Sequence, residues 1–307
     1  MKLSCIKQKN ILTAAIALFS ASAAHAYEPN TPFAIPTAAT IGVAAGANPP
    51  PGNYFSISLR STRGDIVDAS GDKIGVSLNS NTLALGYSYV PGVRILGGDY
   101  RFTATLPIVH VSQSTDISVA HVKTDDSGFG DISISPFNLS WNLDKEIFAS
   151  AGVVFNIPIE SFNSDITTAN VSSGKRSVSF LMGFSNLRNG WNQSIASSLT
   201  IYEENPHTHY KSGSELMFNL TALKEIDNNF SVGPVGFWRK QLEDDENKGP
   251  LLGGGIRARA EQVGLGIGLA KNFGSGQINL NFVKNIRTRN TEDLPVLTFN
   301  YSMPFGK

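Results

Sequence analysis

The final stretch of the chain alternates apolar and polar side chains with a period of two. From position 297 onward, small or polar side chains separate apolar ones at every second position. The apolar positions are Leu297, Phe299, Tyr301, Met303 and Phe305. A strand with this period has one apolar and one polar face. The pattern fits a half-buried soluble sheet, or a barrel strand that lies between lipid and a lumen.

Similar alternation recurs along most of the chain and predicts twelve strands. In the fourth, the apolar positions change phase at Pro136, as a β-bulge allows. No segment after residue 26 has the 18 apolar residues of a membrane helix. Only helices and closed barrels satisfy every backbone group in lipid, so a membrane location requires a closed barrel. The predicted strands cover residues 55–60, 82–89, 100–106, 132–141, 149–157, 177–185, 191–201, 216–222, 230–240, 263–269, 277–282 and 297–305.

The connections and the tryptophans favour the membrane. Long polar connections follow the first, third, fifth, seventh and ninth strands, whereas most of the others are short, as in outer-membrane barrels. Trp141 and Trp191 adjoin short turns and Trp238 adjoins a long loop, where two interfacial girdles would lie. We therefore predict an all-β, transmembrane, antiparallel β-barrel of about 12 strands, with both termini periplasmic. The last strand closes it against residues 55–59. The long connections are 62–80, 111–129, 160–175, 203–213 and 242–260.

The start of the chain predicts export. Residues 1–26 combine a basic start, an apolar run and an A-x-A site, which is typical of a cleaved signal peptide. The only cysteine, Cys5, lies within them. Without Lys2, Lys7 and Lys9, 22 basic side chains face 25 acidic ones, a formal charge of −3 that does not favour nucleic acid. Residues 27–52 form a proline-rich leader, periplasmic or inserted in the lumen, and residues 53–307 form the barrel.

Charged and glycine positions on the polar strand faces are candidates for the lumen. Arg60, Arg101 and Asp131 lie in the polar phase of their strands. An arginine on the lipid face costs about 2–4 kcal/mol at mid-bilayer, so we expect them to point inward and to tune selectivity or pair across the lumen. The glycines at 264, 266 and 268 leave space on the lumen wall or mark a kink; they are Gly264, Gly266 and Gly268.

Enzymatic and metal sites are not predicted. His207 and His209 could share a face of an extended chain beside Glu203 and Glu204, but they lack the set of ligands that defines a metal site. A hydrolase would need a base such as His110 or His121, and no motif ties a particular serine to either. Gly253, Gly254 and Gly255 lack the strand–turn–helix context of a phosphate loop. We predict no cofactor.

Several motifs, in order, resemble one family. They occur at 48–55 (NPPPGNYF), 127–132 (SGFGDI), 204–206 with Tyr210 and Ser212–Gly213, and 231–236 (SVGPVG). With them the chain resembles the meta-pathway phenol-degradation-like (SphA-family) outer-membrane proteins over nearly its whole mature length. The resemblance implies an outer-membrane barrel associated with degradation of aromatic or other hydrophobic compounds. The chain departs from it at the end, where Gly306 and Lys307 follow Phe305.

The residues and the resemblance together predict a channel in the Gram-negative outer membrane. Its function would be passive uptake of small hydrophobic or aromatic compounds. The expected partners are outer-membrane lipids, lipopolysaccharide and the barrel-assembly machinery. A structural or adhesive barrel that acts through its outer loops is the alternative, and a barrel lipid hydrolase is a third possibility.

Overall fold

The computed structural model describes residues 27–117, 120–165, 168–227, 229–249 and 258–306, and the predicted signal peptide lies outside them. Within these residues the only helical element is a 3-10 turn, η1 (Arg188–Gly190). No helix in this part of the chain is long and apolar enough to cross a membrane. The wall strands are β1 (Gly52–Val67), β2 (Lys73–Val90), β4 (Gly98–Ile117), β5 (Ala120–Phe129), β6 (Ile132–Asp144), β7 (Ile147–Ile157), β8 (Ser177–Asn186), β9 (Trp191–Tyr202), β11 (Glu215–Asp227), β12 (Phe230–Gln241), β14 (Glu261–Phe273), β15 (Gly276–Arg289) and β17 (Val296–Phe305).

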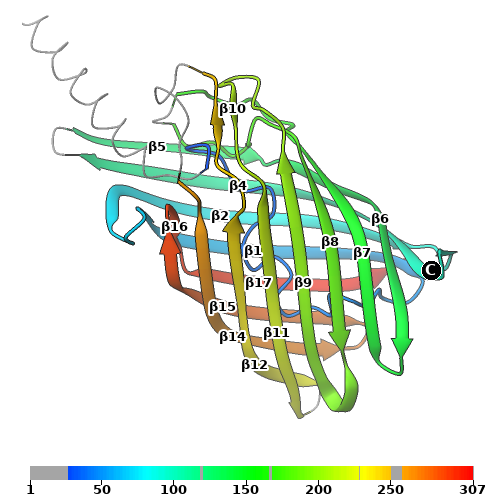
Figure 1. Cartoon of the computed structure of the whole chain (residues 1–307). Helices are drawn as coiled ribbons and strands as arrows, with labels where there is room; N and C mark the ends of the chain where they lie inside the picture. Colours follow the sequence, from blue (N-terminus) through cyan, green and yellow to red (C-terminus); the bar gives the residue numbers. More distant parts are fainter. Residues whose placement is uncertain (1–26, 118–119, 166–167, 228, 250–257, 307) are drawn as a thin grey trace, which may run out of the picture.

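These strands close into one antiparallel barrel of twelve wall strands (Figure 1). β4 pairs along one side with β6 and, further along, with β5, so β5 and β6 together form the fourth wall strand. β17 closes the barrel against β1, with Phe299 opposite Leu59 and Met303 opposite Phe55. The predicted closed all-β barrel is confirmed. Two short strands extend the same sheet: β3 (Arg94–Ile95) pairs with β4, and β16 (Thr291–Asp293) pairs with β1. Two others, β10 (Tyr210–Lys211) and β13 (Glu246–Asn247), pair only with each other.

The two faces of the wall differ as the alternation predicts. On β8, Phe180, Met182 and Phe184 are exposed, while Ser179 and Ser185, which flank them, are buried. Successive side chains of a strand point to opposite faces. The outer surface is therefore apolar and the lining of the barrel is small and polar, which is the distribution of a membrane barrel.

Met182 tests the lipid-facing assignment because its side chain is 67% exposed in the middle of β8. We expect Met182→Arg to lower the free energy of unfolding by about 2–4 kcal/mol, since arginine is costly at the bilayer midplane. Ile226→Arg, at the end of β11 and 62% exposed, should cost no more than about 1 kcal/mol because it lies near the interface. Denaturant titration in lipid vesicles measures both. Equal costs at the two depths would contradict the assignment.

The predicted loop at 111–129 is wrong. β4 continues to Ile117, and β5 pairs back on it from Ile117↔Ala120 to Ile108↔Phe129, so the segment is a β-hairpin that extends beyond the neighbouring strands (Figure 1). Likewise, β1 and β2 shorten the connection predicted at 62–80 to residues 68–72. The sequence signal failed because both faces of the hairpin carry polar side chains, including the buried Gln113 and Thr115, so the segment shows no apolar alternation.

The predicted bulge in the fourth strand is confirmed. The register of β6 against β7 shifts between Ile134 and Phe137, and the register of β4 against β6 shifts between Arg101 and Thr103. Pro136 lies within this shift, where its missing N–H leaves no ladder bond unmade. The shift lets the apolar side chains after Pro136 remain on the outer face.

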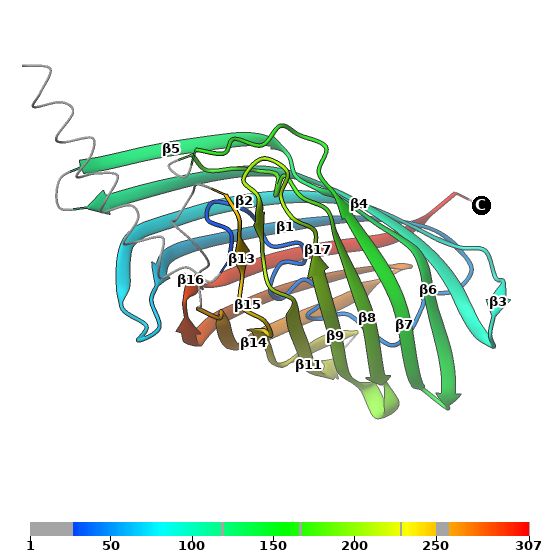
Figure 2. The ribbon, with the colours of Figure 1, turned by 45° about the horizontal axis from the view of Figure 1, so that its top comes forward.

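The first wall strand, β1, begins at the end of the barrel that carries the short turns, and the last, β17, ends there. The residues before β1 run in the opposite direction: Figure 2 shows this segment, in dark blue, inside the curve of the sheet. Glu28 bonds to Lys175 and Thr208, which belong to the long loops at the opposite end. The first described residues therefore lie at the long-loop end. That both termini are periplasmic remains a prediction.

The three tryptophans have different local partners. Trp141 donates its indole N–H to the Leu96 carbonyl at 3.0 Å, in the turn that contains β3. Trp191 follows η1, and the Lys224 ammonium lies 5.6 Å from its ring centroid. Trp238 stacks on Phe218 with centroids 5.8 Å apart, on the long-loop side of β12. Their role as an interface girdle remains a prediction.

Candidate functional site: the leader inside the barrel and the long-loop mouth

The leader, residues 27–51, follows the inner wall without forming a strand or helix. Its backbone bonds instead to polar side chains that line the barrel. Gly42 N donates to Thr221 at 3.0 Å, and Gly46 N donates to Ser185 at 2.8 Å. Ser150 donates to the Ala45 carbonyl at 2.8 Å. Serine and threonine positions on the wall thus satisfy backbone groups that a buried loop would otherwise leave unpaired.

Two glycines allow the leader to approach the wall closely. A Cβ on Gly46 would lie 2.7 Å from the Ser185 nitrogen, and a Cβ on Gly183 of β8 would overlap the Ala45 carbonyl oxygen. Neither position has room for a side chain. The leader and β8 are therefore in backbone contact near the short-turn end.

Apolar side chains of the leader occupy a patch on the opposite wall. Ala38 and Ile41 are both buried against it. The wall residues come from five neighbouring strands, so the patch lies on one side of the barrel. They are Leu223, Val235, Phe237, Ala270, Val283 and Val296.

A buried ion pair fastens the beginning of the leader to the long loops. The Lys175 ammonium lies 2.8 Å from the Glu28 carboxylate, and their side chains are 0% and 3% exposed. Lys175 also donates to Ser212 at 2.8 Å, and Asn205 and Thr208 donate to Glu28. Lys175 lies in the β7–β8 connection, and its polar neighbours lie in the β9–β11 connection. The cluster therefore joins the leader to both connections.

A second buried ion pair joins β11 and β12 inside the barrel. Arg239 of β12 pairs with Glu215 of β11, and Tyr202 donates to the same carboxylate at 2.9 Å. The guanidinium lies over the ring of Phe33 of the leader, 3.4 Å from its centroid. Tyr27 meets Tyr202 edge to face, with centroids 5.4 Å apart. Aromatic side chains of the leader therefore contact charged and aromatic side chains of the wall at the long-loop end of the barrel.

Asp245 joins the two loops that flank β11 and β12. It accepts bonds from Tyr210, from Gly213 N at 2.7 Å and from Gln241. Burial raises the pKa of its carboxyl to about 6, and the three hydrogen bonds oppose that shift only in part. Lys175, which also lowers this pKa, faces it from the β7–β8 connection.

This pKa predicts a pH dependence of loop packing. The folded pKa lies above the unfolded one, so the protonated form favours the packed loops. Asp245 contributes most below about pH 4, and the contribution falls as pH rises to about 6, by on the order of 2–3 kcal/mol. Amide hydrogen exchange of residues 210–214 should therefore quicken from pH 4 to pH 7 beyond its intrinsic rate. Asp245→Asn should remove this excess, and an unchanged excess would contradict the assignment.

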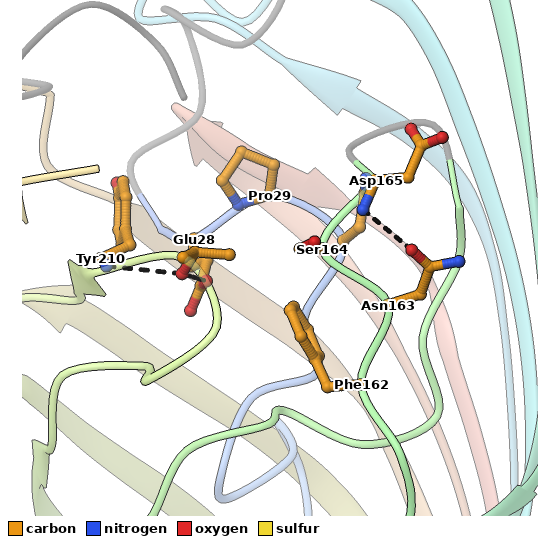
Figure 3. Close-up of a pocket in the computed structure, with 9 residues that line it drawn as sticks. Glu28, Pro29, Phe162, Asn163, Ser164, Asp165 and Tyr210 are labelled. Atoms are coloured by element: carbon orange, nitrogen blue, oxygen red, sulfur yellow. Dashed lines mark hydrogen bonds between the residues drawn. The ribbon is translucent and has the colours of Figure 1, made fainter. Parts of the chain in front are cut away.

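A small hollow lies above the first ion pair (Figure 3). Glu28 and Pro29 form one side, Phe162 and Asp165 of the β7–β8 connection another, and Tyr210 a third. Phe162 also packs on His207, with ring centroids 5.6 Å apart. The long loops therefore fold over the start of the leader.

The three charged candidates from the sequence lie apart and serve different contacts. Arg60 donates to the carbonyl and hydroxyl oxygens of Thr37 in the leader. Asp131 accepts bonds from Ser172 at 2.7 Å and from Ser173 N, so it holds the β7–β8 connection. Arg101 is partly buried, and its Nε has no hydrogen-bond partner among the described residues. Their role in selectivity remains a prediction.

The β14 glycines make room for neighbouring side chains. A Cβ on Gly264 would overlap the Phe237 ring, and one on Gly268 would lie 2.8 Å from Val235 and 3.1 Å from Leu223. A Cβ on Gly266 would overlap the Phe282 carbonyl oxygen of β15. Two of these glycines thus accommodate residues of the apolar patch.

The histidines lie apart, and each has a different partner. His110 Nδ1 lies 2.7 Å from Ser127 Oγ across the β4–β5 hairpin, whereas His121 pairs with Asp116. His209 pairs with Glu204 at 3.1 Å. Within the described ranges, no group of three or more potential metal-binding side chains comes together. The segment 253–255 lies outside these ranges.

Sequence reasoning missed the buried pairs at the mouth. Glu215 and Arg239 lie on the inner face of their strands, so strand parity alone could have found them. Nothing local distinguishes Glu28 or Lys175, because each lies in a segment without periodicity. Their importance depends on a contact across 147 positions of sequence.

The barrel with its apolar exterior defines a protein of the outer-membrane barrel class, and two solved structures share the fold. The COG4313 outer membrane channel from Pseudomonas putida F1 is 19% identical, with a TM-score of 0.73 over 85% of this chain and 98% of that one. The transport unit of the autotransporter AIDA-I from Escherichia coli is 9% identical, with a TM-score of 0.52 over 83% and 90%. A search of curated proteins finds no significant match.

The family follows from the sequence itself. The family described as "Putative MetA-pathway of phenol degradation" matches residues 61–297. Because this match covers most of the chain, the protein belongs to that family. The resemblance drawn from the short motifs is confirmed.

Proposed function

We propose that the protein is an outer-membrane channel for passive uptake of small hydrophobic or aromatic compounds. The observation that carries the proposal is an apolar patch on a mostly polar inner wall. An apolar surface inside the barrel can hold an apolar molecule when the leader does not cover it. Membership in a family described by phenol degradation favours aromatic compounds among the apolar ones.

In this proposal each part of the chain has a role. Residues 1–26 direct export and are removed, residues 27–52 form the constriction, and residues 53–307 form the barrel in the outer membrane. The assembly machinery would insert the barrel, and acidic side chains near Glu243 and Glu246 would meet divalent cations of lipopolysaccharide. Displacement of the leader opens the path, and no catalytic step or cofactor is involved.

The test combines conductance and uptake. Purified protein in planar bilayers should show discrete conductance steps, and a deletion strain should take up an aromatic substrate more slowly than the same strain carrying the gene on a plasmid. Heat-denatured protein is the control for the bilayer. If neither conductance nor uptake depends on the protein, the channel proposal is wrong.

The β4–β5 hairpin favours a second candidate function, that of a surface contact. It extends beyond the neighbouring strands (Figure 1). One of its faces exposes charged and polar side chains, among them Asp116, Lys123 and Asp125. Replacing residues 112–125 by a short turn should abolish cell adhesion under this alternative and leave uptake intact. Loss of uptake with normal adhesion would refute it.

A further inference from the structure

We propose that the apolar patch is a binding site for a small apolar molecule that carries one hydroxyl group, and that Ile41 of the leader occupies this site until the ligand displaces it. The patch consists of Leu223, Val235, Phe237, Ala270, Val283 and Val296, as defined above. The inference deepens the proposed function, because it assigns the place and the chemistry by which the transported class of compound is recognised.

The composition of the wall singles out this side of the barrel. The inward side chains of β6 to β9 are mostly small and polar, and Ser140, Ser150, Ser179, Ser185 and Ser194 are all buried. The patch gathers aliphatic side chains and one phenyl ring from β11, β12, β14, β15 and β17. In a water-filled lumen such a surface would be exposed at a cost, so it requires an apolar occupant.

Ile41 is that occupant in this state of the molecule. Its side chain is fully buried among the patch residues, and Ala38 covers the adjoining part. An isoleucine side chain is close in size to a small branched or cyclic hydrocarbon. The site is therefore already shaped around an apolar group of that size.

The turn that carries Ile41 is only loosely held by its own backbone. Its internal bonds, Ala39 N to Pro36 O and Ile41 N to Ala38 O, are both 3.3 Å long. Ala38 has a φ of 62°, in the left-handed region that an L-residue adopts at a cost. Release of the turn would relieve this strain. Detachment breaks the bonds that Arg60, Asn219 and Asn281 make to the turn, while the wall keeps its hydrogen-bond ladder.

Polar groups beside the patch indicate the hydroxyl. Asn219 and Asn281 are buried on the wall, and their amide nitrogens donate to Thr40 Oγ1 at 2.9 Å and to the Ile41 carbonyl at 3.3 Å. The side-chain oxygen of each has no hydrogen-bond partner among the described residues. A Cβ on Gly42 would lie 3.2 Å from the Asn281 oxygen, so that acceptor faces the leader. A ligand hydroxyl can donate to such an acceptor and accept from the amide.

Competition with the leader links binding to opening. A ligand that binds only the leader-free wall has an apparent affinity reduced by the fraction of molecules in which the leader is detached. Anything that weakens the hold of Ile41 should therefore strengthen ligand binding. Binding in turn shifts the leader toward the detached state.

The test measures binding of 4-fluorophenol and fluorobenzene by ¹⁹F NMR, with full-length protein in detergent and a micelle-only blank. Ile41→Ala should bind 4-fluorophenol more tightly than the unmodified protein, on the order of tenfold, because more molecules have a free site. Val93→Ala, an exposed truncation in a short turn, is the matched control and should change nothing. Phe237→Ala combined with Ile41→Ala should reverse the gain.

A further variant tests the hydroxyl. Asn281→Leu should lower the ratio of 4-fluorophenol to fluorobenzene affinity, even though it also loosens the leader and so favours both probes. Equal affinity of Ile41→Ala and the unmodified protein, or no binding by either, would overturn the proposal. The channel function is tested separately. If the protein binds 4-fluorophenol at this site but neither conducts nor supports uptake, the binding site is supported and the transport function is wrong.

Discussion

Replacing Lys175 with methionine will release the start of the leader from the long loops. Lys175→Met leaves the Glu28 carboxylate buried without its counter-charge, and breaking a buried pair in this way costs about 3–5 kcal/mol. The leader can avoid that cost by moving Glu28 into water, because residues 27–35 belong to no strand or helix. Amide hydrogen exchange of these residues should accelerate strongly while the barrel strands remain protected.

Two further variants serve as controls for Lys175→Met. Lys248→Met removes a cation that pairs with Glu204 at 2.9 Å, but with side chains 63% and 36% exposed. An exposed pair contributes no more than about 1 kcal/mol, so this variant should exchange like the unmodified protein. Glu28→Leu combined with Lys175→Met should restore protection in the leader, since no unpaired charge remains. If Lys175→Met alone leaves exchange unchanged, the ion pair does not hold the leader.

The second large effect is expected at Gly183, where a side chain cannot coexist with the leader. Gly183→Val places its Cβ in the space of the Ala45 carbonyl oxygen and 2.5 Å from Ser150 Oγ. The wall strand is fixed by ladders on both sides, so the leader must shift. The shift breaks the bonds of Ala45 and Gly46 to Ser140, Ser150 and Ser185, each of which contributes about 0.5–1.5 kcal/mol.

The measurable result is a wider passage through an intact barrel. Single-channel conductance of Gly183→Val should increase severalfold over that of the unmodified protein, and protease should reach residues 42–48. Ala151→Val, opposite Met182 on the lipid face of the neighbouring β7, is the control and should leave both properties unchanged. A Gly183→Val protein with unaltered conductance would show that the leader does not constrict the barrel at this point.

Much of the wall could be predicted from the sequence because its signal is local. The alternation of β8 and β17 reports directly which side chains face lipid, and the phase change at Pro136 reports the bulge. The hairpin of β4 and β5 escaped because polar side chains occupy both of its faces, including Gln113 and Thr115, which are buried. A strand that is polar on both faces shows no apolar alternation, whichever face is covered.

The interior was harder to predict for a different physical reason. Arg60 and Asp131 could be placed on the polar face, yet their partners, Thr37 and Ser172, come from segments without any periodic pattern. The sequence does not distinguish one serine of β8 from another. Only the path of the leader makes Ser185 the hydrogen-bond acceptor for Gly46 N. The alternation of a strand predicts that the lining is polar, but it does not predict which segment binds to that lining.

The sequence by itself determined that this chain forms a closed membrane barrel, because lipid on one face and a lumen on the other require a period of two in every wall strand. It also determined the family, through motifs between residues 48 and 236 and a family match over residues 61–297. Only the tertiary structure decided that the leader crosses the interior to the long-loop end and that Glu28 meets Lys175 there. That contact depends on the circumference and register of all the strands together, and no short stretch of sequence records those.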